Sequence, residues 1–126
     1  MKETIYLYRV DDPETIKLIQ FMAVRLGVKV KRITEDMVGR KVGYIAGLEG
    51  YTAETSDAGF AVPQEQMMLM QNFTSQKIDQ LLAFFRTAGI PRINLKAMLT
   101  DNNKEWYFFE LHEELRREHQ EMSERR

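Results

Sequence analysis

The chain has 126 residues, of which 44% are hydrophobic and 29% are charged, and its formal net charge is −1, which is typical of one soluble globular domain spanning residues 1–126. Cysteine is absent, which excludes disulfides, thiol nucleophiles and zinc sites built on thiolates. Neither half has the basic excess of a nucleic-acid-binding domain and no apolar run approaches the ~18 residues of a membrane helix, so we expect neither nucleic acid nor membrane as a partner.

The first unit, residues 1–48, begins without a signal-peptide pattern, which favours a cytoplasmic location. Residues 4–10 are rich in β-branched and aromatic types and predict a strand. The Asp-Asp-Pro-Glu sequence that follows suits a helix N-terminus, and apolar residues spaced by three and four predict a helix over residues 13–26 that ends at Gly27. Residues 28–33 alternate between apolar and basic types, as a second strand would.

Residues 37–48 match no single element, because each of three glycines spaced four apart disfavours a helix by about 1 kcal/mol relative to alanine. In a helix the three would share one face, where a neighbouring backbone, a ligand or a partner can approach closely. Tight packing of a short helix on the sheet is the simpler explanation. If the face binds a partner, the predicted surface comprises Gly39, Gly43, Tyr44, Gly47 and Tyr51.

Residues 49–64 are polar and small and predict a loop. Loops of this length are uncommon in compact domains, so we expect this one to be either mobile or functional. The second unit, residues 65–126, then repeats the plan of the first: an apolar strand at 67–70, a helix that ends at Gly89, a strand at 93–99 and a last helix.

The start of the last helix is predicted from Asn102 and Glu105, which are spaced as in a capping box. Both units then consist of a strand, a helix ending in glycine, a strand, a turn and a helix, which suggests an internal repeat made of two βαβ units. Right-handed crossovers make each unit locally parallel. We predict an α/β fold with a four-stranded, mostly parallel sheet of order 2-1-3-4 covered by helices, and a ferredoxin-like α+β arrangement as the alternative.

Lys96 is the one charged residue in a strand that otherwise resembles core. A lysine at the edge or end of the sheet, reaching water, explains it without a function. The functional hypothesis places its ammonium near Thr100, Asn102 and Asn103 at the carboxyl-terminal edge of the sheet, where a small anion or a nucleotide would bind.

Catalytic and metal chemistry have no convergent residues in this sequence. His112 and His119 are about 10 Å apart along a helix at 1.5 Å per residue, so they cannot share one metal ion, and a solvated charged face is the simpler interpretation. Neither histidine has an identifiable nucleophile beside it. We expect no metal, no cofactor and no catalytic residue.

Three stretches resemble a family of small bacterial proteins that is defined only as a domain of unknown function. They read Val-Gly-Tyr-Ile-Ala-Gly-Leu at 42–48, Met-Met-Leu-Met at 67–70 with Phe73, and Lys-Ala-Met-Leu-Thr at 96–100 continuing through Trp106 to Glu-Glu-Leu-Arg-Arg-Glu-His at 113–119. The resemblance implies a bacterial, cytoplasmic protein, and it brings no activity, cofactor or catalytic residue.

From these observations we expect a non-enzymatic interaction or regulatory module. Its partner would be another protein or a second copy of the chain, docked on the glycine-bearing segment and adjoining loop or on the last helix. The alternative is a protein that binds a small anion or a nucleotide through the residues around Lys96.

Overall fold

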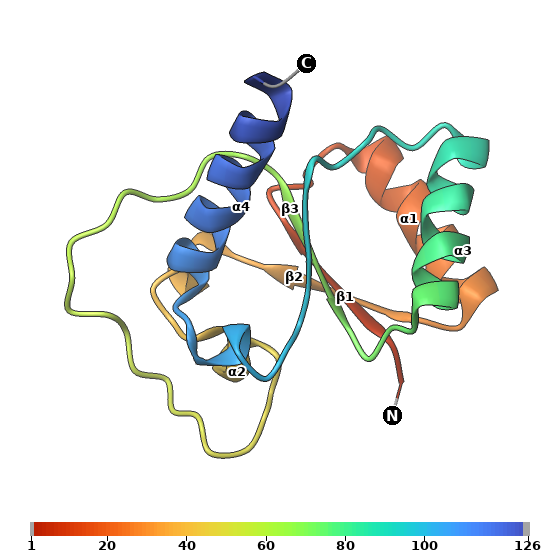
Figure 1. The fold of residues 1–126 in the computed structure, drawn as a ribbon. Coiled ribbons are helices and arrows are strands. Elements are labelled where there is room, and N and C mark those ends of the chain that lie inside the picture. Colours follow the sequence, from red (N-terminus) through yellow and green to blue (C-terminus); the bar gives the residue numbers. More distant parts are fainter. Residues whose placement is uncertain (1, 125–126) are drawn as a thin grey trace.

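In a computed structural model, which describes residues 2–124, four strands form one sheet with helices on both faces (Figure 1). The elements are β1 (Thr4–Tyr8), α1 (Pro13–Leu26), β2 (Lys29–Ile33), the 3₁₀ helix η1 (Glu35–Met37), α2 (Val42–Ile45), β3 (Met67–Gln71), α3 (Ser75–Ala88), β4 (Leu95–Met98), the 3₁₀ helix η2 (Asn103–Glu105) and α4 (Phe108–Glu124). None of the helices in the described part of the chain is long and apolar enough to cross a membrane.

The strand order is β2-β1-β3-β4, with β1 parallel to β2, β3 parallel to β4 and β1 antiparallel to β3. The predicted order and the mostly parallel sheet are confirmed. Because β1 pairs directly with β2, the parallel strands are not split as in the ferredoxin-like alternative. The antiparallel central pair also means that the two units direct their carboxyl ends to opposite edges, so the sheet has no single carboxyl-terminal edge.

The helices α1 and α3 begin and end where local sequence predicts. Asp12 Oδ2 accepts a hydrogen bond from Thr15 N at the start of α1, and Thr74 Oγ1 caps α3 in the same way. Gly27 and Gly89 follow the two helices with φ near +70°, a left-handed conformation that glycine adopts without steric cost.

The two faces of the sheet carry separate apolar cores. In Figure 1, α1 and α3 lie side by side on one face, and α4 with α2 lies on the other. Every residue of β1 and β3 is buried, which is why these central strands are mostly apolar rather than alternating. Burial of each large apolar side chain contributes about 1.5–3 kcal/mol, so the central strands anchor both cores.

The last helix starts later than the capping-box pattern predicts, and that prediction is wrong. Asn102 makes no capping hydrogen bond, Glu105 accepts a hydrogen bond from Tyr51, and Trp106 is extended. Glu110 Oε1 instead accepts a hydrogen bond from Tyr107 N at 3.0 Å, directly before α4. The capping carboxylate is therefore five residues further along the chain.

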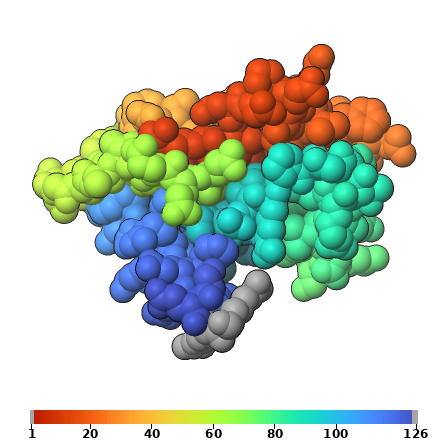
Figure 2. All heavy atoms as spheres, turned by 90° about the horizontal axis from the view of Figure 1, so that it is seen from above, coloured from red at the N-terminus to blue at the C-terminus, as the bar shows by residue number. Residues whose placement is uncertain are grey.

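The loop over residues 49–64 is held to the domain at several points. Ser56 N donates to Gly39 O at 2.8 Å, and the Tyr8 hydroxyl donates to Pro63 O at 2.6 Å. The Phe60 ring stacks on Phe109 of α4, with 4.3 Å between ring centroids. In Figure 2 this loop lies along the surface next to α4. The loop therefore covers part of the apolar core on the α4 face of the sheet.

Candidate functional site

Lys96 lies on β4, an edge strand of the sheet, as the non-functional interpretation of this residue predicts. It stands opposite Met68 in the register with β3, which directs its side chain to the α3 face. The neighbouring residues Leu95 and Ala97 point to the α4 face and join the core there. Lys96 is half-buried, and its Nζ donates to Ile93 O at 2.7 Å, towards the amino end of the strand.

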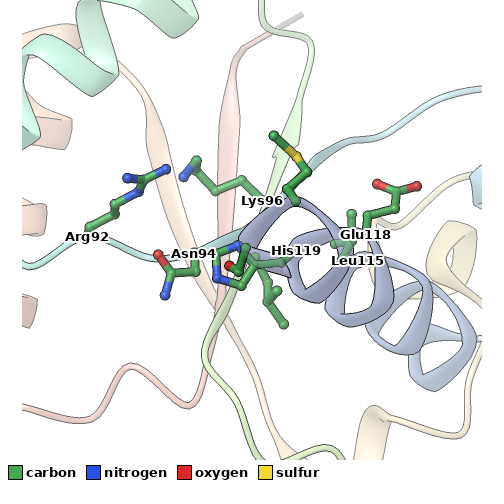
Figure 3. A pocket seen from close by; sticks show the side chains of 9 residues that line it. Arg92, Asn94, Lys96, Leu115, Glu118 and His119 are labelled. Atoms are coloured by element: carbon green, nitrogen blue, oxygen red, sulfur yellow. The ribbon is translucent and has the colours of Figure 1, made fainter. Parts of the chain in front are cut away.

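A pocket of about 260 Å³ lies where the second half of α4 passes the start of β4; we call it the β4–α4 pocket. Its polar lining includes Arg92, Asn94, Lys96, Glu118 and His119. Figure 3 shows Arg92 and Lys96 extending towards one another, and the Glu118 carboxylate on the other side of Lys96, away from Arg92.

The two cations of this pocket have no acidic partner in the described part of the chain. None of the ion pairs formed by residues 2–124 includes Arg92 or Lys96. Burial, and after it the positive charge of Arg92, lower the pKa of Lys96 below its ordinary value. Two positive charges that share a concave surface without a carboxylate between them favour binding of an anion.

Thr100, Asn102 and Asn103 are not brought to the Lys96 ammonium. Thr100 lies four residues further along the chain, beyond the end of β4 and about 13 Å away at 3.3 Å per residue, and the Lys96 side chain points the other way. Thr100 Oγ1 accepts from Asn103 N at 3.0 Å, and Asn103 Oδ1 accepts from Thr100 N at 2.8 Å. Asn103 Nδ2 also donates to Met98 O at 2.8 Å, whereas Asn102 is exposed. Thr100 and Asn103 thus close a turn.

The predicted partner surface is covered mainly by the protein's own loop. A Cβ on Gly43 would lie 2.6 Å from the Tyr51 ring, and one on Gly39 would meet Thr55 and Phe60. Only α2 is helical in this segment, so the glycines do not form a helical stripe. The two remaining members lie apart from this contact: Gly47 has open space around it, and the Tyr44 hydroxyl accepts from Arg40 Nη1 at 3.2 Å.

The two histidines of α4 have different surroundings, which corrects the prediction that both lie on a solvated face. His112 is buried with its Nε2 2.9 Å from Glu65 O and its ring edge-on to Tyr8. His119 is half-buried and lines the β4–α4 pocket. Among residues 2–124, no three histidine or acidic side chains gather closely enough to hold a metal ion.

Sequence reasoning missed Arg92, Asn94 and His119 as neighbours of Lys96. The two polar residues between Pro91 and the strand were the available signal, since a loop entering an edge strand is exposed. Their meeting with His119 depends on the path of α4, which no local pattern records.

Residues 66–122 match the model of a family described as a domain of unknown function, DUF3783. The matched stretch runs from β3 through most of α4 and contains Arg92, Lys96 and His119. No curated protein and no solved structure matches the chain. The resemblance expected from the sequence is confirmed in the second unit, which is similar to this family of unknown function.

Proposed function

We propose that the protein is a binding module for a small anionic ligand, held in the β4–α4 pocket by Arg92 and Lys96. One observation carries the proposal: these two cations extend towards one another at one concave surface, and neither forms an ion pair with any described residue. This site differs from the anion site expected around Thr100, because it lies at the amino end of β4.

The chemistry of the pocket supports an anion. A guanidinium presents a fork of N–H donors that matches a carboxylate or phosphate, and an ammonium adds a compact positive charge. Asn94 and His119 line the same pocket and can donate hydrogen bonds to further oxygen atoms. A volume of about 260 Å³ suits a small ion or metabolite and is too small for a dinucleotide.

An interaction module that uses the glycine-bearing segment has less support. Tyr51, Thr55 and Phe60 of the chain itself already occupy the space that Gly39 and Gly43 leave open. The close approach that a glycine permits is therefore explained within the domain.

The test compares anion binding by wild type, Arg92→Ala and Lys96→Ala, measured by thermal shift and by NMR titration with acetate and with phosphate. Arg32→Ala is the matched control, because Arg32 lies on the other edge strand and is paired with Asp11 at 2.7 Å. We expect at least tenfold weaker binding in both pocket variants and unchanged binding in Arg32→Ala. Equal binding by all four proteins would refute the proposal.

A further inference from the structure

A second hollow adjoins the same two cations on the α3 side of β4; we call it the α3 hollow. Its volume is about 390 Å³, and it is bounded by α3, β3 and the segment that leads into β4. Arg92 and Lys96 line both this hollow and the β4–α4 pocket. The two depressions therefore meet at one pair of positive charges.

The walls of the α3 hollow are apolar. Leu82 and Phe85 come from α3, Ile90 and Ile93 from the following segment, and Met68 from β3. Leu82 is half-buried, whereas the other four are buried in the core. The charged lining of the hollow is entirely basic, since Arg86 joins Arg92 and Lys96. An apolar surface bordered only by cations is complementary to a molecule with an apolar body and an anionic end.

We infer that the ligand is a carboxylate carried on an apolar group, such as a short or medium-chain fatty acid or an arylacetate. The carboxylate lies between Arg92 and Lys96, and the apolar group enters the α3 hollow beside Leu82. This inference rests on the proposed function and names the class of anion that the site takes.

A singly charged group suits this position better than a phosphate does. Helix α3 ends at Ala88, next to the Ile90 wall of the hollow. The carboxyl-terminal ends of helices carry partial negative charge, which disfavours a doubly charged anion. Glu118 in the lining of the β4–α4 pocket acts in the same direction.

The test measures binding of acetate, butyrate, hexanoate and octanoate to wild type by isothermal titration calorimetry, with inorganic phosphate as the ligand without an apolar part. Each methylene buried in the hollow strengthens binding by about fourfold, so we expect affinity to rise along the series until the hollow is full. Leu82→Trp fills the hollow, so its affinity should show no gain with chain length. Gln80→Trp, at an exposed position of the same helix, is the control and should keep the gain.

The outcomes separate this inference from the proposed function. If acetate and phosphate bind in an Arg92-dependent way and longer chains bind no better, the ligand class is wrong and the anion site stands. If the wild-type protein binds none of these anions, the proposed function is wrong as well. The wild-type series together with the same titrations of Arg92→Ala decides between these results, so the test does not depend on the folding of Leu82→Trp.

Discussion

The two halves of the chain have the same order of elements, and they differ most after their second strands. In the first half, β2 is followed by η1 and by α2, a helix of four residues. In the second half, β4 is followed by η2 and by α4, a helix of 17 residues. Only the longer helix reaches back along its own edge strand to form a wall beside it, which creates the β4–α4 pocket.

The cations at the two edges of the sheet differ in whether they have an acidic partner. A hollow of about 250 Å³ between α1 and β2 contains Arg32, but Arg32 Nη2 bonds to Asp11 Oδ1 and to Val10 O. At β4, Arg92 and Lys96 share their hollow without an ion pair from the described residues. The comparison indicates that the cation on β2 is already paired within the protein, whereas the two cations at β4 are available to bind an anionic ligand. Common ancestry of the two halves stays a prediction.

The largest expected effect concerns the turn between β4 and α4. Asn103→Ala removes the two hydrogen bonds that the buried Asn103 side chain makes, with Thr100 N and with Met98 O, and should lower the free energy of unfolding by about 2–4 kcal/mol. Asn102→Ala, at the exposed neighbouring position, should change it by no more than about 0.5 kcal/mol. Urea unfolding measures both. Equal losses would show that the side-chain hydrogen bonds of Asn103 do not stabilise this turn.

The next effect concerns the glycine contact in the first half. Gly43→Ala places a Cβ 2.6 Å from the Tyr51 ring and should destabilise the fold by about 1–3 kcal/mol through overpacking. Gly59→Ala is the control, since a Cβ there meets nothing within 4 Å, and its effect should stay within about 0.5 kcal/mol. Thermal unfolding compares the two. Combining Gly43→Ala with Tyr51→Ala should cost less than the sum of the single changes, and strict additivity would contradict the contact.

A smaller effect tests the paired edge directly. Asp11→Ala breaks an exposed ion pair with Arg32, so it should cost about 0.2–1 kcal/mol, and less at high salt. The same change removes the carboxylate partner of the Arg32 guanidinium in the hollow between α1 and β2. Weak acetate binding should therefore appear at β2, as NMR shift changes of residues around Val30 that wild type lacks. If acetate caused no shift changes at β2 in Asp11→Ala, this result would contradict the idea that ion pairing distinguishes the two edges of the sheet.

The smallest effect is confined to alkaline pH. Donation of a hydrogen bond to Glu105 raises the pKa of Tyr51 from 10.0 to about 12 and joins the loop of the first half to η2 of the second. Because the folded-state pKa is the higher one, this contribution to stability is complete below pH 10 and is lost as pH rises towards 12. Thermal unfolding across that range should show a smaller decline for Tyr51→Phe than for wild type. Identical declines would mean that this hydrogen bond does not contribute.

Several features of the fold could be predicted because they depend on neighbours in the sequence. Asp12 and Gly27 mark the two ends of α1 through bonds within a few residues, and the parallel pairing of β1 with β2 and of β3 with β4 follows from two consecutive βαβ units. The capping box at Asn102 failed because long-range and side-chain bonds competed with it. The Asn103 side chain donates a hydrogen bond to Met98 O, and the Glu105 carboxylate accepts one from the hydroxyl of Tyr51, which lies far away in the sequence.

The candidate site, too, depends partly on neighbours in the sequence and partly on residues far away in it. The position of Lys96 in an apolar run identified an unusual charge, but its partners were expected downstream at Thr100, and its Nζ points upstream to Ile93 O. Arg92 lies four residues before Lys96, whereas His119 lies 23 residues after it, and only the course of α4 brings the latter to the pocket.

The amino-acid sequence by itself determined α1, α3, the strands and the parallel pairing within each unit, because caps, glycine stops and apolar periodicity act over a few residues. Tertiary structure alone decided the antiparallel pairing of the two units, the loop that covers Gly43 and the pocket beside Lys96. These features depend on contacts between residues far apart in the chain, and such contacts form only when the whole sheet and both of its cores are assembled.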